Sequence, residues 1–396
     1  MRTKIKQLAS SYFDEVLQIR RHIHQHPELS FHEHNTSSFI IKKLEEWQIP
    51  YKKGVAGTGV LAFIESGKAG VKRIGLRADM DALPIQEQNE IPFKSKYPQV
   101  MHACGHDVHT ANLLGVAKIL NTLREDLPAD YLFVFQPGEE LLPGGAAQVL
   151  EDPTFQEHKP DLMIGLHVYP DLPVGKIGFK AGEYMASTDE IYIRISGNGG
   201  HAAMPHKIND TVLATAQLIV ASQQVTARFI PTQVPSVLSF GKIEARGATN
   251  VIPSKVDIAG TFRTMNEAWR IKAHEKIQQI AQYTAKQFNC TAEVDIVKGY
   301  PTLYNAPELV EPAITATKKL LGRGAIEHLG IRMTAEDFAY YAQEMPALFF
   351  RLGTNNNEND FGAALHSPFF NIEEKALELS MQTMSYLAIE LAKEIR

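Results

Sequence analysis

The sequence predicts an α/β protein of two domains, in which a mostly parallel sheet flanked by helices is interrupted by an inserted β-α-β-β-α-β module. Three observations support this prediction. Short apolar segments alternate with helical patterns before residue 184, the pattern changes between residues 184 and 298, and the first pattern then returns. A chain of 396 residues is also longer than one hydrophobic core usually supports. The predicted domains are residues 1–183 with 299–396, and residues 184–298.

The first domain begins with two amphipathic helical patterns, the second of which ends before Pro50. Four short apolar segments follow, and a further helical pattern separates the second from the third. The expected helices are 5–25, 36–47 and 110–123, and the expected strands are 59–65, 73–78, 131–136 and 161–165. Apolar strands spaced by helices are typical of a largely parallel sheet, whose ligands collect beyond the carboxyl ends of the strands.

The inserted module has the order of a ferredoxin-like split βαβ fold. Its expected strands are 190–196, 236–245, 255–264 and 291–298, and its expected helices are 210–228 and 266–289. After the module, Thr334 and Asp337 stand at capping-box spacing and predict a helix start. The elements expected there are helices 307–321, 334–343 and 372–394 and a strand at 347–352.

The composition excludes several classes of partner. A charged fraction of 21%, a net charge of −5 and the absence of any like-charge run give no sign of a nucleic-acid groove or a membrane surface. Cys104 and Cys290 are the only cysteines, so a disulfide framework is not expected and a reducing compartment fits best. The first residues lack the apolar segment of a signal peptide. We therefore expect a cytoplasmic protein.

Metal-binding side chains gather at residues 102–109 and at three predicted strand ends. Cys104 and His106 offer a thiolate and an imidazole, and Glu140, His167 and His366 each follow an apolar segment. This mixed donor set suits zinc or another borderline divalent metal, and manganese, cobalt and nickel stay open. Five ligands exceed one tetrahedral shell, so we expect two ions that share a water. Taken singly, each histidine is better explained as a core or surface residue; their convergence favours the metal site.

Carboxylates near these ligands have more than one possible role. Glu139 and Glu140 are adjacent, so one could bind metal while the other transfers a proton, and the residues alone do not say which. A solvated surface pair is the alternative. Asp79, Asp81 and Asp107 could orient ligand histidines, or could equally cap a helix or turn.

Other histidines and glycines stand outside this set. The densest histidine cluster has no strand-end carboxylate after it, so we expect exposed or structural roles for His22, His24, His26, His32 and His34. His102 and His109 flank the Cys104 and His106 pair and are not assigned as ligands. The Gly-rich turn at residues 197–201 would let the backbone approach a ligand closely, or would simply be a flexible loop.

These motifs resemble the zinc aminoacylase and carboxypeptidase family, and in particular its amidohydrolase branch of hippurate hydrolases, N-acetyl-diaminopimelate deacetylases and auxin-amino-acid conjugate hydrolases. The resemblance spans nearly the whole chain. The segments that carry it are residues 27–30, 77–84, 102–110, 135–140, 165–168, 199–206, 249–253 and 365–368. Gly138 departs from the pattern, because alanine is more frequent at this position in the family.

The resemblance implies a metal-dependent exopeptidase-like catalytic domain with a dinuclear site. Its ligands would be Cys104, His106, Glu140, His167 and His366. Glu139 would be the general base, and the inserted module would be a lid and dimerisation domain whose His201 reaches the active site of the partner subunit in a homodimer. Asn250 and Arg263 would hold the carboxylate of the substrate.

The expected activity is hydrolysis of the amide bond of a small N-acyl amino acid by a metal-activated water. Two alternatives are open. The same site could act on small peptides as a metallo-dipeptidase or carboxypeptidase. A non-catalytic metal-dependent binding protein is less favoured, because it would need no water-activating base such as Glu139.

Overall fold

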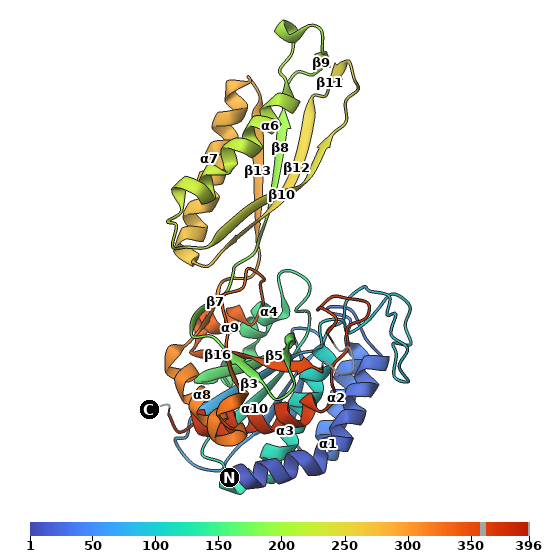
Figure 1. Ribbon diagram of the computed structural model, residues 1–396, viewed down its shortest axis with the longest axis vertical. Coiled ribbons are helices and arrows are strands. Elements are labelled where there is room, and N and C mark those ends of the chain that lie inside the picture. The colour runs from blue at the N-terminus through green and yellow to red at the C-terminus, as the bar shows by residue number, and fades with distance from the viewer. Residues whose placement is uncertain (357–361, 395–396) are drawn as a thin grey trace. The chain divides into compact units, whose positions relative to one another are not determined.

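The structure is a computed structural model that describes residues 1–356 and 362–394. The chain forms two compact units (Figure 1). The first unit consists of Met1–Glu183, Tyr304–Gly330 and Asp337–Arg396, and the second of Tyr184–Leu303 and Ile331–Glu336. The first unit therefore brings together the beginning and the end of the chain. Short strands β7 (Gly182–Met185) and β14 (Leu303–Asn305) lie where the chain passes from one unit to the other.

The first unit is built on an eight-stranded sheet in the order β1-β2-β4-β3-β5-β16-β6-β15. The strands are β1 (Tyr51–Val55), β2 (Gly59–Ile64), β3 (Arg73–Asp79), β4 (Asp130–Gln136), β5 (Leu162–Pro173), β6 (Ile177–Phe179), β15 (Ile326–His328) and β16 (Ala347–Asn355). Neighbours among the central strands β4, β3, β5 and β16 are parallel, and they are apolar and almost wholly buried. The predicted mainly parallel α/β fold is confirmed.

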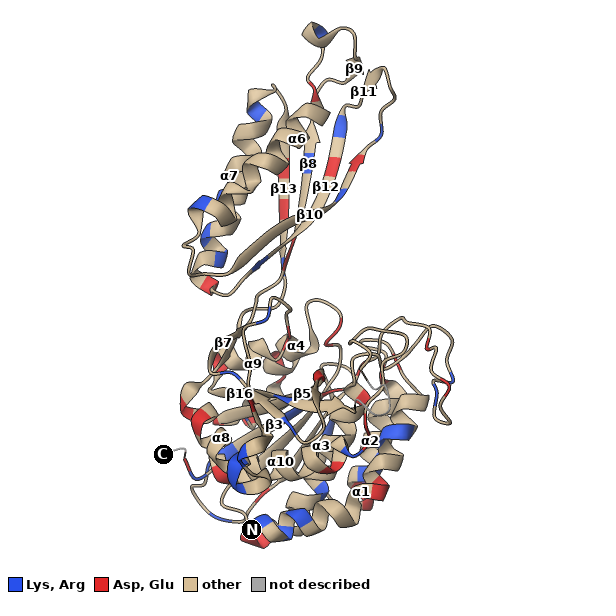
Figure 2. Cartoon of the chain, viewed as in Figure 1, with Lys and Arg blue, Asp and Glu red and all other residues tan. Residues whose placement is uncertain are grey.

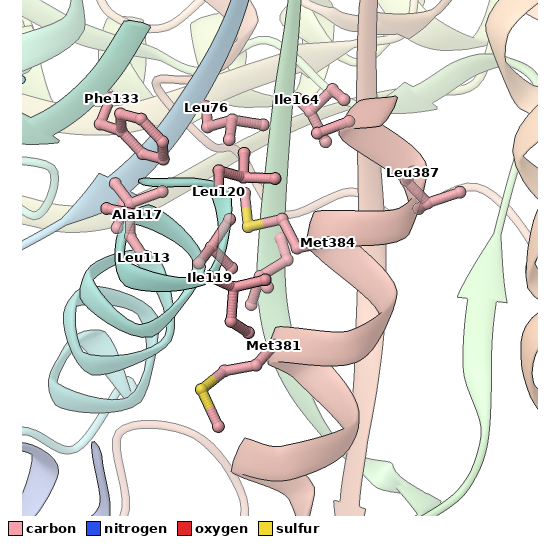
Figure 3. Packing of buried hydrophobic residues seen from close by; sticks show 14 of the residues in the cluster. Leu76, Leu113, Ala117, Ile119, Leu120, Phe133, Ile164, Met381, Met384 and Leu387 are labelled. Atoms are coloured by element: carbon pink, nitrogen blue, oxygen red, sulfur yellow. The ribbon is translucent and has the colours of Figure 1, made fainter. Parts of the chain in front are cut away.

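Helices flank this sheet (Figure 1). They are α1 (Arg2–Gln25), α2 (His34–Glu46), α3 (His106–Thr122), α4 (Gly145–Glu151), α5 (Pro153–Glu157), α8 (Pro307–Leu321), α9 (Ala339–Glu344) and α10 (Ala376–Leu391). Helix α3 is buried along most of its length and packs against the sheet, α1 and α10. Leu113 and Leu120 of α3 belong to the same buried core as Met384 of α10 (Figure 3). Gly115 permits this approach, because a Cβ there would overlap Met381.

The predicted helix start at Thr334 is wrong. Residues 334–338 are not helical, and α9 begins only at Ala339. The reason lies in the Asp337 carboxylate, which accepts hydrogen bonds from Arg77, Gln136 and the Ala146 amide, so it does not cap a helix. The strands β1, β6 and β15 were not predicted. Strands β1 and β15 are the edges of the sheet, and β6, which lies between β16 and β15, has only three residues.

The second unit has a four-stranded antiparallel sheet in the order β10-β12-β8-β13. Its strands are β8 (Asp189–Ser196), β10 (Ser236–Ala245), β12 (Lys255–Thr264) and β13 (Thr291–Lys298), and its helices are α6 (Thr211–Ser222) and α7 (Glu267–Gln287). Both helices pack on one face of the sheet, where Ile191, Ile193 and Ile195 of β8 point toward them. This order is the β-α-β-β-α-β pattern of the prediction. The short strands β9 (Gly200–His201) and β11 (Val251–Ile252) form a separate pair.

Charged residues of both signs are interspersed over the two units (Figure 2). In the described ranges no helix is long and apolar enough to cross a bilayer.

Candidate metal centre

The parallel strands of the first unit deliver the predicted ligands to one edge of the sheet. His106 is the first residue of α3, and Cys104 lies in the turn just before it. Glu140 follows β4, whereas His167 lies within β5, which continues beyond the predicted strand end. The loop before α10 supplies His366, whose amide donates to the carbonyl oxygen of Ala103 at 2.9 Å. That bond joins the late segment of the chain to the segment that carries Cys104.

Short distances connect these side chains. Cys104 Sγ lies 3.4 Å from His167 Nε2, and His366 Nε2 lies 3.3 Å from Glu140 Oε1. Among the described residues, five groups of metal-capable atoms have all their members within 4.8 Å of one another, and three of these contain at least two of the predicted ligands. The three are Cys104, His106 and His167; Cys104, Glu140 and His366; and His106, Glu139 and Glu140. The first two groups share the cysteine, so the arrangement fits two adjoining cation positions with a common ligand.

Two buried atoms in this cluster have no hydrogen-bond partner in the described part of the chain. They are His106 Nε2 and Glu140 Oε1, which lie 4.0 Å apart. A buried polar atom without a partner costs roughly 1–3 kcal/mol, so a ligand is expected between them. Burial raises the pKa of the Cys104 thiol well above its ordinary value, and the neighbouring Glu140 and Glu139 raise it further. A thiolate here requires a nearby cation, and the donor set therefore fits divalent metal ions.

Asp81 orients two of the predicted ligands at once. Its Oδ1 lies 3.1 Å from His106 Nδ1, while its Oδ2 accepts from the Glu140 amide at 2.9 Å and from the Ser30 hydroxyl at 2.6 Å. Burial would raise the pKa of Asp81, but the hydrogen bond and charge of His106, together with the hydrogen bonds from Ser30 and the Glu140 amide, outweigh burial and the pKa is lowered. The pKa of His106 is correspondingly raised to about 10, because Asp79, Asp81 and Glu140 outweigh the effect of burial. This bond leaves His106 Nε2 free to face the other ligands.

Asp79 supports the cluster through a different histidine. Its Oδ1 bonds His109 Nδ1 at 2.6 Å, and its Oδ2 accepts from Arg77 at 2.7 Å. The Nε2 atom of His109 accepts from the Val168 amide at 3.0 Å. Both ring nitrogens of His109 are thus engaged by the protein, which agrees with its not being assigned as a ligand. His102 is also buried, and burial lowers its pKa to about 4.

Asp107 departs from the expectation that it orients a ligand histidine. Its Oδ2 accepts from Arg20 Nε at 2.7 Å and lies 2.9 Å from His24 Nδ1. The other nitrogen of His24 lies 3.2 Å from Glu87. These buried charges join α1 to the first turn of α3. Asp107 therefore anchors the helix that carries His106 and does not contact the imidazole of any predicted ligand.

Glu139 lies beside the cluster and is only 7% exposed. Its Oε1 is 3.5 Å from the amide nitrogen of Asp337. Glu140 faces two predicted ligand histidines, because its Oε1 lies 3.3 Å from His366 Nε2 and 4.0 Å from His106 Nε2. Glu140 therefore contacts the histidines of the cluster, whereas Glu139 contacts the Asp337 backbone.

The predicted substrate residues belong to the second unit. His201 pairs with Val251, and the Ala202 amide donates to the carbonyl oxygen of Asn250 at 2.9 Å, so His201 and Asn250 lie together near the β9–β11 pair. Arg263 lies elsewhere, near the opposite end of β12, where its Nη1 donates to the carbonyl oxygen of Met333 at 3.1 Å. The seven register steps between the Phe262 and Lys255 ends of β12 span about 23 Å. The structure therefore brings together His201 and Asn250 but not Arg263.

Residues 75–390 match the sequence profile of peptidase family M20/M25/M40. The chain belongs to this family. The match covers the strands and loops that carry all five predicted ligands, and it confirms the resemblance noted in the sequence.

The chain is similar to several named proteins over almost their full length. An N-acetyldiaminopimelate deacetylase from Enterococcus faecalis is 38% identical, with 94% of this chain and 96% of the relative covered. An N-acetylcysteine deacetylase from Bacillus subtilis is 37% identical, with 98% and 99% covered. A crystal structure of a dinuclear metal-binding peptidase of the M20 family from Bacillus subtilis is 34% identical, with a TM-score of 0.84 and coverage of 98% and 100%. The sequence relatives are thus named deacetylases, and the solved M20 structure has the same fold as this chain.

Several supporting residues of this M20 site were not predicted. Arg77 and Asp337 are 260 residues apart and form a buried ion pair at 2.6 Å. Glu33 and Ser30 also reach the site from the segment before α2. The resemblance at residues 27–30 was the one signal in the sequence that pointed to this segment.

Proposed function

We propose that the protein is a metal-dependent amidohydrolase that cleaves an N-acyl amino acid into a carboxylate and a free amino acid. The observation that carries this proposal is the pair of ligand groups that share Cys104, with the buried carboxylate of Glu139 beside them. The deacetylase names of the relatives at 37–38% identity support the same reaction class. The ligands in this proposal are Cys104, His106, Glu140, His167 and His366.

Glu139 performs the proton transfers in the proposed mechanism. Divalent ions at such a site lower the pKa of water and polarise a carbonyl oxygen. Glu139 removes a proton from the water as its oxygen bonds to the acyl carbon, and it then delivers that proton to the amide nitrogen as the C–N bond breaks. Its low exposure keeps bulk water from competing for the proton. His201 donates a hydrogen bond to the oxyanion that forms on the acyl group.

The second unit acts as a lid in this proposal, and the functional form is a homodimer. Arg263 lies some 20 Å or more along β12 from the β9–β11 end that carries His201 and Asn250. This distance exceeds the length of a small N-acyl amino acid. One lid therefore does not supply all three residues to one substrate, whereas Arg263 of one subunit and His201 of the other can do so. Arg263 suits the carboxylate because its planar fork matches carboxylate geometry.

We place the enzyme in the cytoplasm. Cys104 and Cys290 are both buried free thiols, and this supports a reducing compartment.

Amine release is the decisive measurement. Apo protein is reconstituted separately with zinc, manganese, cobalt and nickel and is assayed on N-acetyl amino acids, N-benzoyl amino acids, N-acetyl-diaminopimelate and dipeptides. We expect metal-dependent turnover of one acyl amino acid class. Preference for dipeptides would identify a metallo-dipeptidase instead, and binding of two metals without turnover of any substrate would identify a binding protein.

A further inference from the structure

We propose that Glu33 is a positioning residue that fixes the Gly138 backbone and thereby aims Glu139 and Glu140. The proposal concerns the same site as the proposed amidohydrolase function. It rests on that function only where it treats Glu139 as the residue that transfers protons. Glu33 immediately precedes α2 and is fully buried, although nothing in the proton-transfer mechanism uses it.

The Glu33 carboxylate joins three segments that are far apart in sequence. Its Oε1 accepts from the Gly138 amide at 2.8 Å and from the Phe31 amide at 2.9 Å. Its Oε2 accepts from the Thr58 hydroxyl at 2.6 Å. The carboxylate thus connects the loop before α2, the start of β2 and the end of β4. A single side chain at this point holds the strand end from which the Glu pair emerges.

Gly138 is held on both of its backbone polar groups. Glu33 accepts from its amide, and its carbonyl oxygen accepts from the Gly145 amide at 3.0 Å. Its φ of 62° lies in the left-handed region, and the Phe31 ring occupies the space that a Cβ would need. The peptide that leads into Glu139 therefore has a fixed orientation, and this orientation depends on the Glu33 carboxylate.

The same loop reaches the other side of the ligand pair. Ser30 donates to Asp81 Oδ2, and that oxygen also accepts from the Glu140 amide. The segment from Ser30 to Glu33 therefore acts on the chain at two points around Glu139. Glu33 binds the Gly138 amide directly, and Ser30 is linked to the Glu140 amide through Asp81. Two fixed points on either side of Glu139 define where its carboxylate points.

The chemistry of Glu33 argues for a positioning role. No cation contacts it within residues 1–356 and 362–394, and its partners are two amides and a hydroxyl. A buried carboxylate without a cation is costly, and here burial raises its pKa. A glutamine would retain the acceptor oxygen for the Gly138 and Phe31 amides. The inference therefore concerns hydrogen-bond acceptance and predicts that charge at this position is dispensable.

The test compares Glu33→Ala, Glu33→Gln and Glu33→Asp in the full chain with its metals. Zinc affinity is measured by competition with a chromophoric chelator, and kcat and KM are measured on the best substrate of the panel. We expect Glu33→Ala to lower both zinc affinity and kcat by about 10–100-fold with KM changed less, as found for residues that orient ligands. Glu33→Gln should restore both to within about 3-fold. Should the alanine variant not fold, Glu33→Asp withdraws the carboxylate by one methylene and should show the same losses to a smaller degree.

Glu28→Ala is the matched control. Glu28 lies in the same loop, and its carboxylate also accepts from backbone amides, those of Asn35 and Thr36, but it does not contact Gly138. The Glu28→Ala substitution should lower the stability of the fold without changing kcat or zinc affinity. Wild-type zinc affinity in both Glu33→Ala and Glu33→Asp, or a Glu33→Gln variant as impaired as the alanine variant, would overturn the proposal. If wild-type protein hydrolyses no amide, the proposed function fails while the zinc competition still decides the role of Glu33.

Discussion

At the scale of single residues, the adjacent carboxylates of Glu139 and Glu140 have different surroundings, and the proposed function gives them different roles. Glu140 has a buried oxygen without a hydrogen bond that faces two histidines, and its amide is held by Asp81. Glu139 also belongs to two such groups, one with His106 and Glu140 and one with Glu336 and Asp337. Neighbouring carboxylates with different surroundings are a common way for an active site to separate binding from proton transfer.

The first prediction concerns Glu139. Replacement by glutamine removes the base but retains the size and the metal ligands, so kcat should fall by roughly 10²–10⁴-fold. Metal content, measured by elemental analysis of the same samples, should stay at the wild-type value. A variant with normal turnover would exclude Glu139 as the base.

The second prediction concerns Gly138. Alanine there meets the Phe31 ring and also carries the penalty of a positive φ, which is roughly 1–2 kcal/mol by itself. Gly67→Ala is the control, because Gly67 has φ of 72° and open space around it. Urea unfolding should show a larger loss of stability for Gly138→Ala than for Gly67→Ala, and only the former should lower kcat. Equal losses of stability in the two variants, with a normal kcat for Gly138→Ala, would mean that the Phe31 ring shifts to make room without moving Glu139.

At the scale of secondary-structure elements, buried charges fix how helices meet strands. In the second unit, Asp189 at the start of β8 is buried and accepts from Arg270 of α7 at 2.5 Å and lies 2.6 Å from His274. Burial would raise the pKa of Asp189, but its hydrogen bonds to His274 and Arg270 outweigh burial and lower the pKa. One strand end is thereby attached to two turns of α7.

The third prediction follows from that lowered pKa. A carboxylate whose folded pKa lies below its unfolded value stabilises the fold above the unfolded value, here 3.8, and loses this effect as pH falls through the folded pKa. Asp189→Asn should therefore be less stable than wild type at pH 7 and pH 5, and the difference should narrow below pH about 4. Urea unfolding at pH 7, 5 and 3 measures it. A difference that stays constant down to pH 3 would show that the lost stability is not ionic.

The elements also show what the sequence could predict. The strands β10, β12 and β13 have the predicted bounds, because the alternation of apolar and polar residues and the turn residues around it are local signals. The edge strand β1 was missed because its sequence, Tyr-Lys-Lys-Gly-Val, carries no apolar alternation. The five predicted ligands come together because parallel strands end at one edge. The contacts made by Asp107, Asp337 and Glu33 could not be predicted, since each joins segments that only the tertiary fold brings close.

At the scale of the whole molecule, the first unit is assembled from both ends of the chain and the second from its middle. The predicted ligands all belong to the first unit, whereas His201, Asn250 and Arg263 belong to the second. Catalysis by the proposed mechanism therefore requires both units. Because His201 and Arg263 are far apart along β12, the proposal assigns them to different subunits, and this assignment can be tested.

The fourth prediction is complementation between two inactive variants. Glu139→Gln lacks the base but retains His201, and His201→Ala retains the base. In a mixed dimer with lids exchanged between sites, one of the two sites has both groups, so random mixing should recover about one quarter of wild-type activity. The assay follows kcat after the two variants are unfolded together and refolded. No recovery, despite mixed dimers detected by mass, would mean that each lid serves its own site.

The bond between the His366 amide and the Ala103 carbonyl has a consequence for biosynthesis. His366 follows Cys104 by 262 residues, and the whole second unit is made in between. At a synthesis rate of about 5–20 residues per second, the ribosome adds His366 on the order of 10–50 s after Cys104. During that interval the nascent chain holds Cys104 and His106 without the residue that completes their cluster. The five predicted ligands can therefore come together only after the segment that carries His366 has been synthesised.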